Sequence, residues 1–387
     1  MSTGAPETVW VLGAGFSRSL GGPLLDDLFG ADPRDIAFEF PDDRYRGLAT
    51  TYEHVRGVFE WGKLVERKWA DAEQFLVFVD EASADAARQG PSSATFRRIC
   101  YQAQSRSPTG EWTNDLVLQG KQSVIEHFVE NARRLTRQAL AVDCTRFLLS
   151  PDTSAEAWLP YQKWAASLRD CQECKNTVIT FNYDRVPEYL GKFWVPLPNE
   201  AHRTETGPPW VLKLHGSVDW HISGNECHRV QHDLPLRELA IELALAAPGR
   251  SKAGMTNRLF RPLWDAARKA LETANAIVFL GYSFPPTDAL ARQEILSAIA
   301  RNTKSPLQHV DIVLGEDLNA PRSRRLKSLV EASKGGNRLS VTEVQGLDLF
   351  AESPGSDARL VQIVQHPLRA EDYLDVHQRF FDGLKWS

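Results

Sequence analysis

Two kinds of hydrophobic pattern alternate along most of the chain. Short, nearly continuous apolar runs are typical of strands buried in a parallel sheet, and they occupy residues 9–12, 177–181, 211–214, 277–280 and 310–314. Residues 339–344 are expected to add a last strand. Longer segments have apolar residues at three- and four-residue spacing, which indicates amphipathic helices, at 255–274, 288–301, 322–332 and 371–384. This alternation predicts an α/β fold with a doubly wound parallel sheet that is covered by helices on both faces.

The stretch after the first strand and turn departs from this alternation. Residues 55–80 and 124–149 have helical spacing and no β-rich alternation, so we expect a mostly helical inserted block. Within it, residues 89–114 are rich in Ser, Pro, Gly and Arg, which predicts an exposed loop or a mobile lid. The predicted boundaries are 1–33 and 169–350 for the sheet domain, 34–168 for the helical insertion and 351–387 for a C-terminal helical extension.

Composition limits the class of protein. The 387 residues are 42% hydrophobic and 25% charged, which suffices for a large core and excludes intrinsic disorder. The formal net charge of −5 provides no global positive field, so we expect no direct nucleic-acid binding. No apolar run approaches the roughly 20 residues that cross a bilayer, and the N-terminal residues are unlike a signal peptide. We therefore expect a cytoplasmic protein with no membrane partner.

The five cysteines are scattered, at positions 100, 144, 171, 174 and 227. This pattern does not indicate a disulfide framework, and a reducing cytosol fits it best. Cys171 and Cys174 form one C-x-x-C pair, which is half of a structural zinc site. The second pair that such a site needs does not follow. We therefore expect no metal, and we interpret the cysteines as buried or surface thiols.

The first candidate site is a glycine turn directly after the first predicted strand. Gly13, Ala14 and Gly15 follow the apolar run 9–12 and precede a predicted helix. Glycines at such a strand end let the backbone approach a pyrophosphate, and the N–H groups that begin the helix favour an anion. A tight strand-to-helix turn without a ligand explains the same residues, so the turn alone does not identify a nucleotide site.

Polar residues follow three further predicted strands at the edge where open α/β sheets bind ligands. Asn182 and Asp184 lie in TFNYD, His215 lies in LKLHGSVDW, and the third segment is GYSFPPTD at 281–288. Each segment alone has a structural explanation, as a turn cap, a buried histidine or a helix start. Together with the glycine turn, these strand ends indicate a ligand site.

The ordered set GAGFSRSLGGP, TFNYD, LKLHGSVDW and FLGYSFPPTD resembles the sirtuin-like family, in particular its bacterial defence-associated branch that hydrolyses NAD. The resemblance implies a Rossmann-like core with NAD as the substrate. It implies catalytic roles for Asn182, Asp184 and His215. It implies contacts with NAD for Gly13, Ala14, Gly15, Phe16, Ser17, Gly281, Tyr282, Ser283 and Asp288.

These catalytic roles fit the chemistry of the nicotinamide–ribose bond. Its cleavage passes through an oxocarbenium-like state with a cationic leaving group, so positioning and electrostatic stabilisation supply most of the rate. Asn182 is expected to orient a water molecule or the nicotinamide amide. His215 is expected either to polarise a ribose hydroxyl or to act as general base on the attacking water. Asp184 is expected to stabilise the developing positive charge.

The chain departs from the protein-deacylating sirtuins in its motifs. Those proteins place Phe-Arg after the G-x-P turn, where this chain has Leu24 and Leu25, and four zinc cysteines after the His-Gly, where it has only Cys227. The resemblance therefore favours an NAD+ glycohydrolase (NAD+ nucleosidase, or NADase) that releases nicotinamide and ADP-ribose. The alternatives are sirtuin-type ADP-ribosyl transfer or deacylation, and a catalytically silent sensor of NAD or ADP-ribose.

The resemblance also implies regulation and partners. Members of this branch deplete NAD in antiviral defence by abortive infection, and they often work beside a second protein such as a HerA-type ATPase or a short Argonaute. The 11 tryptophans can fill a core or anchor an interface between subunits. We therefore expect a homo-oligomer whose activity is controlled by a partner protein.

Overall fold

The computed structural model describes residues 7–42, 45, 47–86, 90–105, 115–149, 153–171, 175–191, 193–201, 208–230, 241–285, 288–302, 307–334, 339–343 and 361–383. Contacts within the chain divide it into two units. The first, called the sheet unit, comprises residues 1–22, 151–215 and 260–387. The second, called the helical unit, comprises residues 23–150 and 216–259.

The described residues of the sheet unit form a seven-stranded sheet in the order β3-β2-β1-β7-β8-β10-β9, and every neighbouring pair is parallel. The strands are β1 (Glu7–Leu12), β2 (Lys175–Thr180), β3 (Trp210–Lys213), β7 (Ala276–Leu280), β8 (His309–Val313), β9 (Leu339–Glu343) and β10 (Val361–His366). All residues of β1, β3 and β7 are buried, as expected for strands that are covered on both faces.

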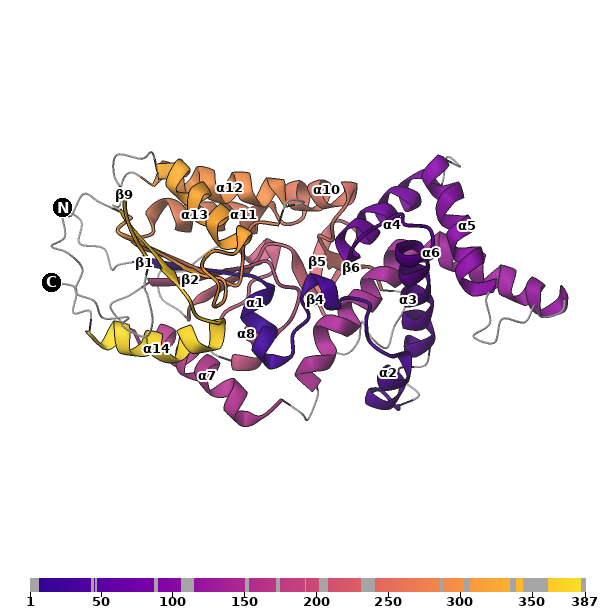
Figure 1. Cartoon of the computed structure of the whole chain (residues 1–387), viewed down its shortest axis with the longest axis horizontal. Helices are drawn as coiled ribbons and strands as arrows, with labels where there is room; N and C mark the ends of the chain where they lie inside the picture. The colour runs from indigo at the N-terminus through magenta and orange to yellow at the C-terminus, as the bar shows by residue number, and fades with distance from the viewer. Residues whose placement is uncertain are drawn as a thin grey trace. The chain divides into compact units, whose positions relative to one another are not determined.

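Helices cover both faces of this sheet (Figure 1). On one face lie α11 (Arg261–Thr273), α12 (Ala289–Arg301) and α13 (Pro321–Lys334). On the other lie α1 (Ala14–Ser17), α7 (Ala155–Asp170), α8 (Val186–Leu190) and α14 (Ala370–Gly383), with the 3-10 turns η1 (Arg18–Leu20) and η4 (Pro198–Glu200) in the same unit. These layers confirm the predicted α/β fold with a doubly wound parallel sheet.

The direction of winding reverses between β1 and β7. From β1 the chain adds β2 and β3 on one side, and it then returns to place β7 on the opposite side of β1. The neighbouring strands β1 and β7 therefore form a topological switch point, and open α/β sheets bind ligands at the carboxyl ends of such strands.

The helical unit contains α2 (Pro33–Glu39), α3 (Leu48–Leu64), α4 (Ala72–Ala86), α5 (Pro91–Ser105), α6 (Asp115–Leu149), α10 (Arg250–Arg258) and the 3-10 turn η2 (Leu25–Asp27). Its described strands form an antiparallel sheet in the order β5-β4-β6, from β4 (Gly216–Ser223), β5 (Glu226–Arg229) and β6 (Leu243–Leu245). Rings of Phe29, Phe59, Trp69 and Phe75 pack against one another in its core.

Three predicted elements differ from the structure. Residues 91–105 of the expected loop form α5, because Pro91 suits a first helical turn and Phe96, Ile99 and Cys100 bury one helix face. The expected helix over 255–274 is two helices, since α11 begins anew with a proline in its first turn. The expected C-terminal helical extension contributes a strand, β10, to the central sheet as well as α14.

The observed units also have boundaries that differ from the predicted ones. The helical unit begins at Pro23 and includes residues 216–259, whereas α7 belongs to the sheet unit. Cys100, Cys144 and Cys227 are buried thiols, but Cys171 is disulfide-bonded, so the expectation of a thiol there is wrong. Cys174 lies outside the described residues.

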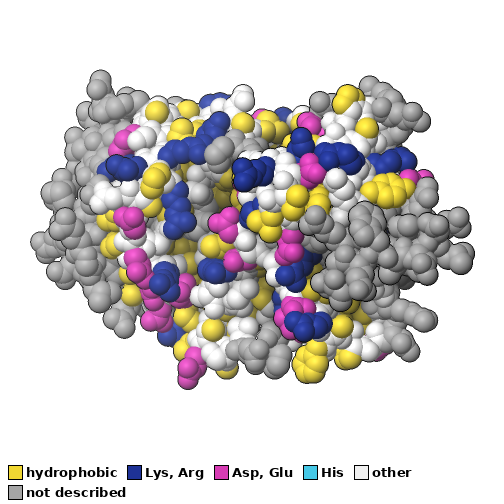
Figure 2. Space-filling view, turned by 45° about the vertical axis from the view of Figure 1, so that its right-hand side comes forward, with side chains coloured by type: hydrophobic (Ala, Val, Ile, Leu, Met, Phe, Trp, Pro, Cys, Tyr) yellow, Lys and Arg dark blue, Asp and Glu magenta, His cyan; other side chains and the backbone are white. Residues whose placement is uncertain are grey.

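The surface carries both signs of charge. Figure 2 shows Lys and Arg side chains next to Asp and Glu side chains across the face that it presents, in keeping with a net charge of only −5. Within the described part of the chain, no helix has both the length and the apolar composition to cross a bilayer.

Candidate functional site

The turns that follow β1 and β7 cross in direct backbone contact. The Gly13 amide donates to the Leu280 carbonyl at 3.1 Å, and the Gly15 amide donates to the Gly281 carbonyl at 3.2 Å. A Cβ atom on Gly13 would lie 2.6 Å from the Gly281 oxygen, and one on Gly281 would lie 2.4 Å from the Phe16 nitrogen. Gly281 also has a φ of +70°, which favours glycine. The crossing therefore explains all three glycines on structural grounds.

The other residues of the glycine turn lie at different depths. Ala14 is exposed at the start of α1. The Phe16 ring is buried edge-on against Tyr161 and Trp164 of α7, and the Tyr161 hydroxyl donates to the Phe16 carbonyl at 2.6 Å. Ser17 is only 2% exposed and faces the turn after β2. Phe16 thus anchors the turn to the core, while Ser17 supports the neighbouring strand end.

Asn182 is held by its amide nitrogen. Nδ2 donates to the Gly13 carbonyl at 3.0 Å and to the Ser17 hydroxyl at 2.9 Å, and the Asn182 backbone N–H donates to Thr180 Oγ1 at 3.1 Å. A backbone carbonyl only accepts, so the amide nitrogen must be the atom that faces Gly13. Among the described residues, no donor is bound to Oδ1. The half-buried Asn182 therefore offers a fixed acceptor oxygen at the switch point.

Asp184 lies behind Asn182 and is buried. Its Oδ2 accepts from the Ser17 hydroxyl at 2.6 Å, and its Oδ1 accepts from the Val186 amide at 3.0 Å. The ammonium group of Lys213 donates to the Asp184 carbonyl and, at 3.2 Å, to Glu188 Oε1. Both carboxylate oxygens of Asp184 thus bind protein donors, so its charge acts on the site from behind Ser17.

His215 follows β3 and lies in an aromatic surrounding. Its ring packs edge-on against Phe181, with centroids 4.9 Å apart, and it is tilted against the Tyr183 ring at 6.2 Å. Its Nε2 lies 3.4 Å from Asp288 Oδ2, and both side chains are buried. The imidazole is therefore enclosed by residues that come from the ends of β2, β3 and β7.

The segment after β7 supplies Tyr282, Ser283 and Asp288. The Tyr282 ring stacks on Phe181 with centroids 4.0 Å apart, and its hydroxyl donates to Asp288 Oδ2 at 2.8 Å. Ser283 is half-buried, and Phe284 after it has a φ of +52°. Asp288 is the N-cap residue of α12, but its side chain makes no cap hydrogen bond. The carboxylate is instead directed to Tyr282 and His215.

The structure thus brings the predicted residues together through two sets of contacts. One set joins Gly13, Ser17, Asn182 and Asp184, and the other joins Tyr282, Asp288 and His215 through Phe181. Sequence analysis missed Phe181 and Lys213. The signal for Lys213 is a lysine within an apolar strand, because a fully buried ammonium group requires partners nearby.

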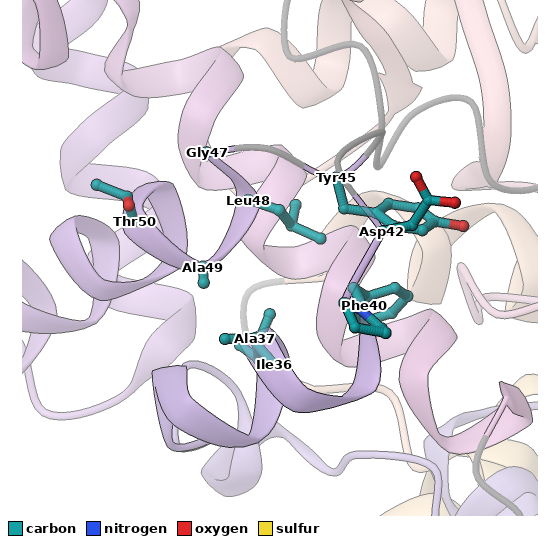
Figure 3. A pocket seen from close by; sticks show the side chains of 10 residues that line it. Ile36, Ala37, Phe40, Asp42, Tyr45, Gly47, Leu48, Ala49 and Thr50 are labelled. Carbon is teal, nitrogen blue, oxygen red and sulfur yellow. The ribbon is translucent and has the colours of Figure 1, made fainter.

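A pocket of about 190 Å³ lies in the helical unit, between the end of α2 and the start of α3 (Figure 3). The rings of Phe40 and Tyr45 meet there with centroids 5.0 Å apart. Its lining contains none of the predicted site residues. Among the residues placed by the structure, no group of three or more His, Cys, Asp or Glu side chains is arranged to hold a metal ion.

Comparisons with known proteins bear on the family of the chain. Comparison with curated proteins finds no match. Residues 176–333 match the model of the SIR2-like domain, a segment that includes Asn182, Asp184, His215 and the turn after β7 but not the glycine turn after β1. This match, together with the parallel sheet, supports the sirtuin-like family and an NAD-related activity for the chain.

Proposed function

We propose that the chain is an NAD+ glycohydrolase that cleaves the nicotinamide–ribose bond at the switch point between β1 and β7. The observation that carries this proposal is the arrangement of Asn182. Its amide nitrogen is fixed by Gly13 and Ser17, which turns Oδ1 into a rigid acceptor beside the glycine turn. A preorganised acceptor of this kind suits a water molecule or the nicotinamide amide, as hydrolysis requires.

In this reaction the bond between ribose C1′ and the nicotinamide nitrogen breaks, and its electron pair neutralises the pyridinium ring. Water oxygen then bonds to C1′ and loses one proton. His215 accepts that proton, or polarises a ribose hydroxyl, because imidazole exchanges protons near neutral pH. Asp184 contributes negative charge from behind Ser17, which favours the cationic transition state. The products are nicotinamide, ADP-ribose and a proton.

The proposal includes a regulated role in the cell. NAD depletion as antiphage defence, assembly into a homo-oligomer and control by a second protein are implied by the family resemblance of the motifs. The match to the SIR2-like domain is compatible with that role. A protein that consumes NAD without control would harm its own cell, and this supports regulation by assembly or by a partner.

Nicotinamide release from NAD by the purified full chain tests the proposal, over a series of protein concentrations. Asn182→Ala and His215→Ala are expected to lower turnover by about a hundredfold or more. The matched controls are Asn319→Ala and His127→Ala, which replace exposed residues of the same types and should retain activity. Bound NAD with no nicotinamide released by any variant would contradict hydrolysis and favour the sensor alternative.

A further inference from the structure

The carboxylate of Asp288 has an unexpected position for a residue that begins a helix. An aspartate at an N-cap usually accepts from the first N–H groups of its helix. Asp288 makes no such bond to α12. Its Oδ2 instead accepts from the Tyr282 hydroxyl at 2.8 Å and lies 3.4 Å from His215 Nε2.

Burial of the Asp288 carboxylate costs free energy, because the group loses its hydration. Asp288 is 3% exposed, and an ionised carboxylate is removed from water only when donors or positive charge replace its hydration. Tyr282 supplies one donor, and its ring is fixed by stacking on Phe181 at 4.0 Å. The imidazole of His215 also lies beside Oδ2, with its Nε2 at 3.4 Å, and it can donate to the carboxylate.

We infer that Asp288 is the positioning residue of His215. An ionised carboxylate only accepts hydrogen bonds, so the imidazole nitrogen that faces it carries the hydrogen. The contact therefore sets the neutral ring of His215 in the Nε2–H form and leaves the lone pair on Nδ1. A carboxylate that orients a histidine in this way also stabilises the imidazolium that forms when the histidine accepts a proton.

The contact distance is consistent with a positioning role. At 3.4 Å it is an ion-pair distance, and Nε2 does not make a formed hydrogen bond to Asp288 in this structure; such a bond has its donor and acceptor at about 2.7–3.2 Å. Hydrogen bonds between catalytic groups are often long without substrate and shorten in the substrate complex. Phe181 packs edge-on against the His215 ring on another side of this contact, with centroids 4.9 Å apart. The catalytic role of this contact rests on the proposed function. The orientation of the His215 ring beside Asp288 is independent of that function.

Nuclear magnetic resonance of the full chain with nitrogen-15 histidine tests the inference without any activity. His215→Ala identifies the His215 signals, which are read at a pH where the ring is neutral. In the unchanged protein we expect the Nε2–H form. The Nδ1–H form in the unchanged protein would overturn the inference.

Asp288→Asn provides the second arm of the test. The asparagine amide can donate to Nε2, so we expect the Nδ1–H form of His215 to increase. Asp372→Asn replaces an exposed aspartate on α14 and should leave the spectrum unchanged. No change of His215 in Asp288→Asn would contradict the assignment of Asp288 as its partner.

Kinetics separate positioning from substrate binding. Asp288→Asn is expected to lower kcat by about a hundredfold or more with little change in KM, and Asp288→Glu to restore part of the loss. A raised KM with unchanged kcat would overturn the inference, because Asp288 would then bind substrate. If the unchanged protein releases no nicotinamide, the proposed function fails, and the spectrum still decides the position of the His215 proton.

Discussion

Gly281 is the residue on which the crossing of the two turns depends. A Cβ atom there would lie 2.4 Å from the Phe16 nitrogen, and its φ of +70° disfavours other residues. We predict that Gly281→Ala lowers the free energy of unfolding by about 1–3 kcal/mol, the range for a non-glycine residue held in such a conformation. Urea unfolding of the full chain measures the loss.

The matched control for this change is Gly57→Ala. Gly57 lies within α3, and a Cβ atom there would meet no other atom within 4 Å. Alanine is expected to stabilise this helix by about 0.5–1 kcal/mol. A Gly281→Ala protein as stable as the unchanged one would show that the turns do not cross as described.

Lys213 is a buried charged residue that contacts the backbone of the site residue Asp184. Its side chain is fully buried and donates to the Asp184 carbonyl and to Glu188. Lys213→Met removes the ammonium group and leaves buried acceptors without their donor, which is expected to destabilise the protein by about 3–5 kcal/mol. Lys163→Met, which breaks an exposed pair with Asp375, should cost at most about 1 kcal/mol. Equal losses in thermal unfolding would contradict this account.

At the site, residue types could be predicted from the sequence but their partners could not. Asn182 and His215 were recognisable because each follows an apolar run that ends in polar residues. The direction of the Asp288 side chain was not, because helix-start aspartates usually cap. Its position beside His215 depends on which strands are neighbours, and no local pattern contains that information.

At the scale of elements, a buried cluster attaches α14 to the sheet. Asp311 Oδ1 lies 2.8 Å from His309 Nε2 and 2.7 Å from His366 Nε2, and its Oδ2 accepts from the Tyr373 hydroxyl at 2.7 Å. Burial alone would raise the pKa of Asp311, but the two histidines outweigh it and hold that pKa well below its usual value. The cluster therefore joins β8, β10 and α14 through one carboxylate.

Tyr373→Phe tests this attachment. The change removes one donor from a buried carboxylate, so we predict a loss of about 1.5–3 kcal/mol in the free energy of unfolding. Tyr189→Phe changes an exposed tyrosine and should stay within about 0.5 kcal/mol of the unchanged protein. Chemical denaturation of both variants provides the comparison, and a loss as small as that of Tyr189→Phe would show that the hydroxyl is dispensable.

In the helical unit, Asp143 of α6 joins α3 and the turn at Phe29. Its Oδ1 accepts from the Tyr52 hydroxyl at 2.6 Å and its Oδ2 accepts from the Phe29 amide at 2.7 Å. Burial raises the pKa of Asp143 from 3.8 to about 7, although both hydrogen bonds lower it. The folded protein therefore binds this proton more tightly than the unfolded chain does.

This shift predicts a pH dependence of stability. Where the folded state binds more protons, stability falls as pH rises, so the contribution of Asp143 is present below about pH 4 and is lost by about pH 7. Asp143→Asn should flatten the stability profile across this window by up to about 4 kcal/mol. Glu130→Gln, an exposed change on the same helix, should leave the slope intact. An unchanged slope in Asp143→Asn would mean that another group titrates there.

Helices and strands that have a clear hydrophobic pattern in their own sequence could be predicted. Elements that form because of contacts with segments far away in the sequence could not. The strands β1, β2, β3, β7 and β8 were recognisable as apolar runs because they are buried on both faces. By contrast, polar residues interrupt β10, whose sequence is VQIVQH, and this strand joins the sheet between β8 and β9. Composition suggested a loop at α5, but burial of one face makes it a helix.

For the molecule as a whole, the position of the candidate site depends on the winding of the central sheet. Winding of the sheet in two directions from β1 places the ends of β1, β2, β3 and β7 at one edge, and the predicted site residues lie there. The sequence pattern predicted the sheet and the match at residues 176–333 supports the family. The NAD substrate and its hydrolysis are proposals, and a biochemical assay tests them.

The reaction of the full chain with NAD in water enriched in oxygen-18 tests the proposed hydrolysis. Mass spectrometry of the products then shows both whether the bond is cleaved and what attacks C1′. We expect equal amounts of nicotinamide and ADP-ribose, with the label on the ADP-ribose, and about a hundredfold less of both products from Asn182→Ala. Release of nicotinamide with the ADP-ribose joined to an acceptor other than water would contradict the proposed hydrolysis.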